Sequence, residues 1–109
     1  MYVKELTDSE IFTPLTLPSP ERQINGVYIG DLLSWVMGRA KADNAWITIM
    51  SNVNVLAVAT LSDVSCIILS EGTVLDDELL KTAEAKGINV LSTALSTYEA
   101  AIRLHEIGI

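Results

Sequence analysis

From residue 25 to residue 109, the hydrophobic pattern alternates between strand-like and helix-like segments. Short runs of β-branched, aromatic and other apolar residues predict strands, and longer stretches with apolar residues at helical spacing separate them. The expected strands are "GVYI", "NAWITIM", "VSCIILS" and "INVLST", at residues 26–29, 44–50, 64–70 and 88–93. The expected helices are "DLLSWVMGRAKA", "NVLAVATLSD", "DDELLKTAEAKG" and "STYEAAIRLHEIG", at residues 31–42, 54–63, 76–87 and 96–108. Four consecutive β-α units predict an α/β fold, with a mostly parallel sheet covered by helices on both faces.

Polar residues mark where these helices begin. The expected N-caps are Asp31, Asn54, Asp76 and Ser96. Glu99 follows Ser96 at the spacing of a capping box, while Gly87 and Gly108 mark the ends of the last two helices.

Residues 1–24 are less regular than the rest. Residues 3–12 can form a short helix and residues 12–17 a short strand, and Pro14 restricts that strand to an edge of the sheet. With 109 residues, no internal repeat and no low-complexity tract, the chain is expected to form one domain.

Composition narrows the classes of partner. Half of the residues are hydrophobic and 19% are charged, which is more apolar than an average soluble domain. This excess predicts either a sheet buried on both faces or a surface covered by a partner. The net charge of −7 excludes a general attraction for nucleic acid or anionic membranes.

A few sequence features indicate the cellular compartment of the protein and the state of its cysteine. The first residues lack the basic and apolar order of a signal peptide, and Asp63 interrupts the longest apolar stretch, which is therefore not a membrane span. A cytoplasmic location is expected. Cys66 is the single cysteine and lies in an apolar run, so we expect a buried and inert thiol.

Three segments resemble the DRTGG domain family. They are "GVYIGDLLSWVMGRAK", "AWITIMSNVNVLAVATLSDVSCIIL" and "GINVLSTALSTYEAAIRLHEIGI". The resemblance is most specific at residues 31–34, 92–93 and 98–99. Where relatives often carry an Asp-Arg-Glu-like run, this chain has Pro20-Glu21-Arg22-Gln23, and the role of this loop stays open.

The resemblance implies a domain similar to the N-terminal domain of HPr kinase/phosphorylase. Such domains occur alone, in some phosphotransacetylases, or joined to CBS domains in certain pyrophosphatases, and a regulatory, ligand-sensing or assembly role is the usual inference. Some stand-alone members are encoded near iron-only hydrogenase and related redox genes. An accessory protein of a redox system is therefore an alternative function.

Catalytic motifs are absent from the sequence. No glycine is followed by lysine, so the phosphate-binding loop of a kinase is missing and serine kinase activity toward HPr is not expected. His105 is the single histidine and lies in the last turn of the final helix, so neither a metal site nor a Ser-His pair is expected. The sequence therefore predicts a non-catalytic module without a cofactor. An enzyme subunit acting through a polar edge is the other alternative.

Polar loops follow each of the four expected parallel strands. Their carboxyl ends share one edge of the sheet, where open α/β sheets bind ligands. The candidate ligand-binding residues are Asp31, Ser51, Asn52, Asn54, Ser70, Gly72, Thr93 and Ser96. A nucleotide or another small phosphorylated molecule is the expected ligand. Asp31 is interpreted first as an N-cap and second as a ligand contact.

Apolar helical residues raise the question of self-association. Residues 54–63 are apolar on nearly all sides, and such a helix must be covered. Trp35 and Met37 are interpreted as packed side chains or, if they face outward, as an interface. The candidate interface residues are Trp35, Met37, Val55, Val58 and Leu61. A homodimer is the expected assembly, and a different protein partner is the alternative.

Overall fold

The chain forms a five-stranded sheet in the order β1-β5-β4-β3-β2. The computed structural model describes all residues, Met1–Ile109. The strands are β1 (Thr13–Thr16), β2 (Val27–Ile29), β3 (Ala45–Thr48), β4 (Cys66–Leu69) and β5 (Val90–Ser92). Strands β2 to β5 are parallel to their neighbours and β1 is antiparallel to β5. The mostly parallel sheet predicted from the sequence is confirmed.

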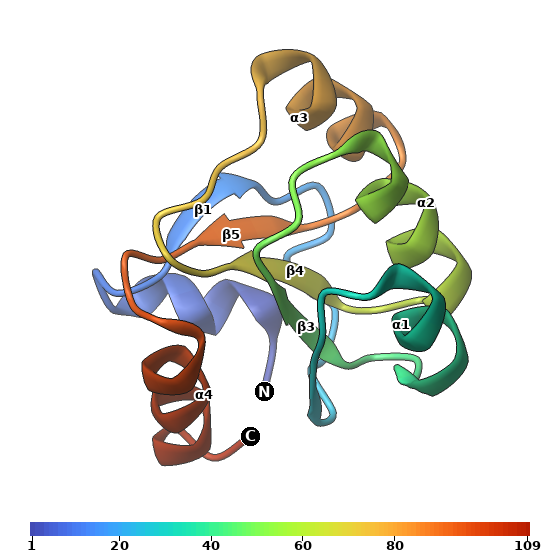
Figure 1. Cartoon of the computed structure of the whole chain (residues 1–109). Coiled ribbons are helices and arrows are strands. Elements are labelled where there is room, and N and C mark those ends of the chain that lie inside the picture. The colour runs from blue at the N-terminus through green and yellow to red at the C-terminus, as the bar shows by residue number, and fades with distance from the viewer.

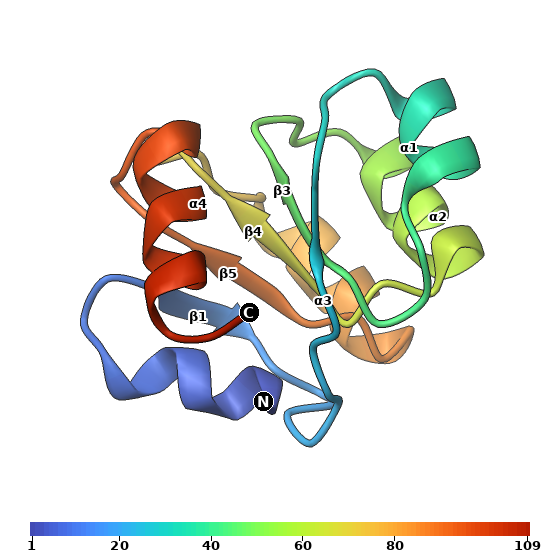
Figure 2. The ribbon, with the colours of Figure 1, turned by 90° about the horizontal axis from the view of Figure 1, so that it is seen from below.

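Helices cover both faces of this sheet (Figure 1). They are the 3-10 helix η1 (Val3–Asp8) and the α-helices α1 (Leu33–Arg39), α2 (Val53–Ser62), α3 (Asp77–Ala85) and α4 (Thr97–Glu106). Helices α1, α2 and α3 lie on one face, and η1 and α4 on the other (Figures 1 and 2). Both chain ends lie on the η1–α4 side in the two views.

The central strands are buried on both faces because their side chains alternate between two cores. Trp46 and Ile67 point into the core under α1–α3, whereas Ile47 and Ile68 point into the core under η1 and α4. Each of these four side chains is fully buried. The continuous apolar runs of the sequence are thus explained by a central parallel sheet, and much of the apolar composition is used inside the chain.

The N-terminal segment completes the sheet and the second core. Pro14 lies in β1, which is the edge strand predicted from its presence. The register of β1 against β5 shifts between Pro14 and Thr16, so the pairing is irregular there. The predicted N-terminal helix is shorter than expected and is a 3-10 helix, because only Val3–Asp8 are helical.

Two of the predicted helix starts are confirmed and one is shifted. Asp76 accepts from the Leu79 amide, and Ser96 forms a capping box with Glu99. The prediction for Asn54 is wrong, because the N-cap of α2 is Asn52, whose side chain accepts from the Asn54 amide at 2.9 Å. No helix of the fold is long and apolar enough to cross a membrane.

Candidate functional site

The four parallel strands end at one edge of the sheet, as the order of elements predicted. The turns that leave this edge begin at Gly30, Ile49, Ser70 and Thr93. They bring all eight sequence-predicted ligand residues to the same edge. These residues differ in whether their polar groups already form hydrogen bonds within the chain.

Asp31 is not the N-cap of α1, and this prediction is corrected. Helix α1 begins at Leu33, and Leu32 occupies the N-cap position without a side-chain hydrogen bond. Asp31 Oδ1 instead accepts from Thr48 Oγ1 at 2.8 Å and from the backbone N–H of Ile49 at 3.0 Å. The carboxylate therefore joins the ends of β2 and β3 and occupies both of these donors.

The turn before α2 is the most open part of the edge. Ser51, Asn52 and Asn54 are all exposed. The Asn52 side chain caps the helix by accepting from the backbone N–H of Asn54, whereas the Ser51 hydroxyl and the side-chain amide of Asn54 have no partner in the chain. Helix α2 carries no acidic residue in its first turn, in contrast to α3 and α4. Uncharged donors therefore surround a helix N-terminus that keeps its positive dipole end.

The turns after β4 and β5 are held to each other. Ser70 and Thr93 are buried, at 0% and 3% exposure. The Ser70 and Thr97 hydroxyls are 2.7 Å apart, and the Gly72 N–H donates to the Thr93 carbonyl at 2.8 Å. Ser96 is occupied by its capping box. These residues are hydrogen-bonded to one another, so few of their donors remain free.

Thr97 was not anticipated as a member of this edge. Its hydroxyl is the partner of Ser70 across 27 residues. The sequence gives little indication of this contact, because a threonine at the first position of a helix is common and does not by itself predict a hydrogen bond to a distant residue.

Charge at this edge is acidic. Asp31 and Glu71 lie in its turns, and further acids lie at the starts of α3 (Asp76, Asp77, Glu78) and α4 (Glu99). No lysine or arginine lies among residues 48–54, 70–73 or 93–97. Backbone amides, hydroxyls and side-chain amides would therefore have to bind any anion here. The cavities of the fold lie elsewhere: one of about 450 Å³ lies between η1 and α4, and another lies beside residues 18–22.

The predicted interface residues fall into two groups. Val55 and Val58 are 0% and 4% exposed and belong to the core under α1–α3, so the prediction that they contact a partner is wrong. Leu61 is on the surface. Trp35 and Met37 also face outward, at 53% and 52% exposure, and the Arg39 guanidinium lies 3.9 Å from the Trp35 ring centroid.

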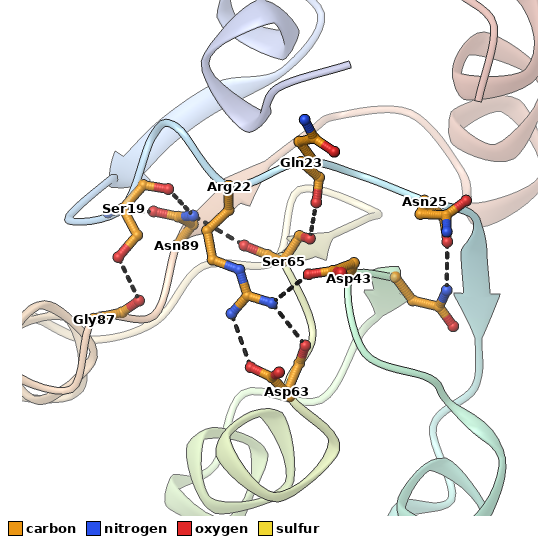
Figure 3. Close-up of polar contacts among 10 residues, drawn as sticks. Ser19, Arg22, Gln23, Asn25, Asp43, Asp63, Ser65, Gly87 and Asn89 are labelled. Carbon is orange, nitrogen blue, oxygen red and sulfur yellow. Dashed lines mark hydrogen bonds and ion pairs between the residues drawn. The ribbon is translucent and has the colours of Figure 1, made fainter.

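A polar network at the opposite edge of the sheet was missed by the sequence analysis (Figure 3). Arg22 donates from Nη2 to Asp43 Oδ1 at 2.7 Å and from Nη1 to Asp63 Oδ1 at 3.0 Å. It also donates to the Asp63 backbone carbonyl at 2.9 Å. Asp43 and Asp63 both have left-handed backbone conformations, with φ of 67° and 55°. Arg22 thus joins the turns that precede β3 and β4.

Asn89 extends this network toward β5 (Figure 3). Its Nδ2 donates to the carbonyls of Ser19 and Ser65 at 2.7 and 2.9 Å, and its Oδ1 accepts from the Ser19 N–H at 2.9 Å. The Ser65 hydroxyl donates to the Gln23 carbonyl. The loop that carries Pro20-Glu21-Arg22-Gln23 is therefore a structural connection from the N-terminal segment to the sheet.

Burial and pairing shift the pKa values of two groups in the interior and the network. Burial raises the pKa of the Cys66 thiol to about 12. For Arg22, burial lowers the pKa, but the hydrogen bonds to Asp43 and Asp63 outweigh it, so that its pKa is raised. Cys66 is fully buried in its strand, as the sequence predicted.

The family is decided by a match along most of the chain. The family model of the DRTGG domain matches residues 19–107. The chain belongs to the DRTGG domain family. The resemblance read from the residues is thus confirmed, and the matched range includes both the polar edge and the Arg22 network of this DRTGG domain.

A solved structure has the same fold. It contains the CBS and DRTGG domains of the regulatory region of the Clostridium perfringens pyrophosphatase, complexed with its activator diadenosine tetraphosphate. The TM-score is 0.65 at 14% sequence identity, over 83% of this chain and 40% of that chain. This DRTGG domain therefore spans less than half of the chain that it matches. No curated protein matches it in sequence.

Proposed function

We propose that this DRTGG domain is a non-catalytic regulatory module. It senses a small phosphorylated or nucleotide-like ligand at the carboxyl edge of the sheet, and it works as a homodimer. The observation that carries the proposal is the open turn before α2, where Ser51 and Asn54 keep unpaired donors beside a helix N-terminus without acidic residues. The regulatory setting of the pyrophosphatase relative, which was solved with a nucleotide activator, supports the same ligand class.

The chemistry of the turn favours a phosphate group over a cation. Backbone N–H groups at the start of a helix and the helix dipole attract negative charge. Asn54 lies in the first turn and Ser51 just precedes the cap, so both can donate to the same group. Without a lysine or arginine at this edge, binding would depend on uncharged donors, which fits a reversible sensor.

The neighbouring turns provide a route for a response. The Ser70–Thr97 hydroxyl pair connects the end of β4 to the first turn of α4. A ligand that spans the edge would change the environment of this pair, and with it the position of α4. Neither the single histidine nor the single cysteine is available for catalysis at this edge. His105 lies in the last turn of α4, and the Cys66 thiol is fully buried.

Thermal unfolding with a ligand panel tests this function. Inorganic phosphate, AMP, ADP, ATP and diadenosine tetraphosphate would each be added to the wild-type protein. A ligand at 100 times its Kd stabilises the native state by about 2.7 kcal/mol, which raises Tm by several degrees in a domain of this size. We expect a rise for at least one member of the panel.

Asn54→Asp is the diagnostic variant, because it adds a negative charge at the turn without changing the size of the side chain. It should weaken binding at least about tenfold, since like charge opposes the phosphate. Asn25→Asp is the matched control, because Asn25 is also exposed but lies at the opposite edge. No rise with any ligand, or equal binding by the Asn54→Asp variant, would overturn the proposed site.

A further inference from the structure

The two outermost strands of the sheet, β1 and β2, differ in how well they are protected from pairing with a strand of another chain. At the β1 edge, Pro14 removes a backbone donor and the register against β5 is irregular beside it, and both features discourage pairing with another chain. At the other edge, β2 pairs only with β3. Its residues are Val27, Tyr28 and Ile29, with no proline, no charge and no bulge. In Figure 2 the segment that carries β2, in cyan, lies in the foreground of the sheet.

The free backbone groups of this edge can be assigned from the bonds to β3. The Ala45 N–H donates to the Gly26 carbonyl, and the Gly30 N–H donates to the Ile47 carbonyl. In a parallel ladder the direction of the backbone groups alternates from residue to residue. The N–H and C=O groups of Val27 and Ile29 therefore point away from the sheet, and those of Tyr28 point toward β3.

Apolar side chains flank the free edge. Ile29, Leu32 and Trp35 are 48%, 60% and 53% exposed, and they follow each other from the end of β2 into α1. An unprotected edge strand beside exposed apolar residues is the pattern of a surface that is paired in the functional assembly.

Charge favours a second copy of this chain over a basic partner. Residues 24–42 carry one acid, Asp31, against Arg39 and Lys41, so this segment is +1 and the rest of the chain is −8. Two copies that meet through this segment keep their strongly acidic surfaces apart. A surface selected to bind a basic partner would instead carry part of the acidic excess.

We propose that β2 pairs antiparallel with β2 of a second copy, about a two-fold axis that passes beside Tyr28. Val27 then faces the second copy's Ile29 as a hydrogen-bonded pair, with the reciprocal pair on the other side of the axis. The two Tyr28 residues face each other in between, and the two sheets become one continuous sheet. This assignment deepens the homodimer of the proposed function and is independent of the ligand site.

Two substitutions at Ile29 test the pairing by sedimentation equilibrium at micromolar concentration. Ile29→Pro removes an outward N–H, which is the device already present in β1, and leaves the Gly30–Ile47 bond in place. By symmetry it removes two hydrogen bonds, so the dimer Kd should rise about 100-fold. Ile29→Lys is the second variant, because it keeps the backbone donor and places like charges together. Circular dichroism establishes that each variant is folded.

The matched control is Val74→Lys, because Val74 is similarly exposed, at 56%, and lies between β4 and α3. It should leave the dimer unchanged. Hydrogen exchange gives a residue-specific check: the amides of Val27 and Ile29 should be protected in the wild-type dimer and exchange rapidly in folded monomeric variants. A wild-type monomer would overturn both this pairing and the proposed homodimer. A wild-type dimer that persists in a folded Ile29→Pro or Ile29→Lys variant would overturn the pairing alone.

Discussion

Asp31 accepts a hydrogen bond from the Thr48 hydroxyl at 2.8 Å and thereby joins the carboxyl ends of β2 and β3. Thr48 is 1% exposed, whereas Asp31 lies at the surface. The aspartate supplies the acceptor that a buried hydroxyl needs. The first β-α turn of the sheet is thus closed by a contact within the protein.

The Asp31–Thr48 bond predicts an order of stability among variants. Asp31→Asn keeps an acceptor oxygen and should change the free energy of unfolding by less than about 1 kcal/mol. Asp31→Ala leaves the Thr48 hydroxyl without its acceptor and should cost about 1–3 kcal/mol. Urea unfolding measures both values. If Thr48→Val removed none of the cost of Asp31→Ala in a double-mutant cycle, the bond would not be its cause.

Arg22 should stabilise the fold more than an ordinary surface ion pair does. Its side chain is 28% exposed, and it joins two turns through Asp43, Asp63 and the Asp63 carbonyl. Arg22→Met should lower the free energy of unfolding by about 1–2 kcal/mol, and Arg22→Lys should recover only part of this because lysine lacks the planar fork.

Arg103→Met is the control for that comparison. Arg103 lies 3.8 Å from Glu106, and the Arg103 and Glu106 side chains are 53% and 59% exposed. Its removal should change stability by less than about 0.5 kcal/mol in urea unfolding. Equal losses for Arg22→Met and Arg103→Met would contradict a structural role for the Arg22 network.

Local features were predictable from the sequence to the extent that their partners are local. Ser96 and Glu99 of the capping box are only three positions apart, so their spacing alone identified it. The Gly30-Asp31 pair has the same local appearance as a helix start. Its true partner, Thr48, is 17 residues away, and no pattern near Asp31 indicates it.

The opposite edge shows the same limit over longer distances. Arg22 and Asp63 are 41 residues apart, and Asn89 and Ser19 are 70 apart. The sequence predicted that the apolar helix α2 must be covered, but not by what. Its periodicity could not show that Val55 and Val58 face the chain's own core. The order of β-α units, in contrast, fixed the shared edge, because parallel strands end together.

Asn89 predicts a case in which an isosteric change is costly. It is 1% exposed and donates to the Ser19 and Ser65 carbonyls. Asn89→Asp would replace these donors with a buried charge facing two carbonyl oxygens. We expect a loss of about 3 kcal/mol, at least as large as for Asn89→Ala. The loss should diminish as pH falls from 7 to 4, because protonation restores a neutral side chain.

Asn25→Asp is the control for this pH series, since Asn25 is exposed and its stability change should be small at every pH. Chemical unfolding at each pH supplies the free energies. A constant difference between the Asn89→Asp variant and the wild type across the pH range would mean that the buried charge is not responsible for the loss.

Cys66 predicts a loss of stability at alkaline pH. Its pKa is raised to about 12 in the folded chain because the thiol is fully buried, against an ordinary value of 9.0. Above pH 9 the unfolded chain releases this proton and the folded chain retains it. The unfolded state then binds fewer protons, so the free energy of unfolding falls as pH rises from about 9 toward 12, with a slope approaching about 1.4 kcal/mol per pH unit.

The contribution of this thiol is isolated by comparing the wild type with Cys66→Ala, since both share every other group that titrates in this range. The alanine variant will be less stable at neutral pH because it leaves a cavity, but its stability should fall less steeply between pH 9 and 10.5. The same burial predicts that a thiol reagent labels Cys66 only as fast as the chain unfolds, with a rate that rises with urea. Fast labelling of the native protein would show that strand β4 opens without global unfolding. Parallel stability curves for the two proteins would show that folding does not raise the pKa of this thiol.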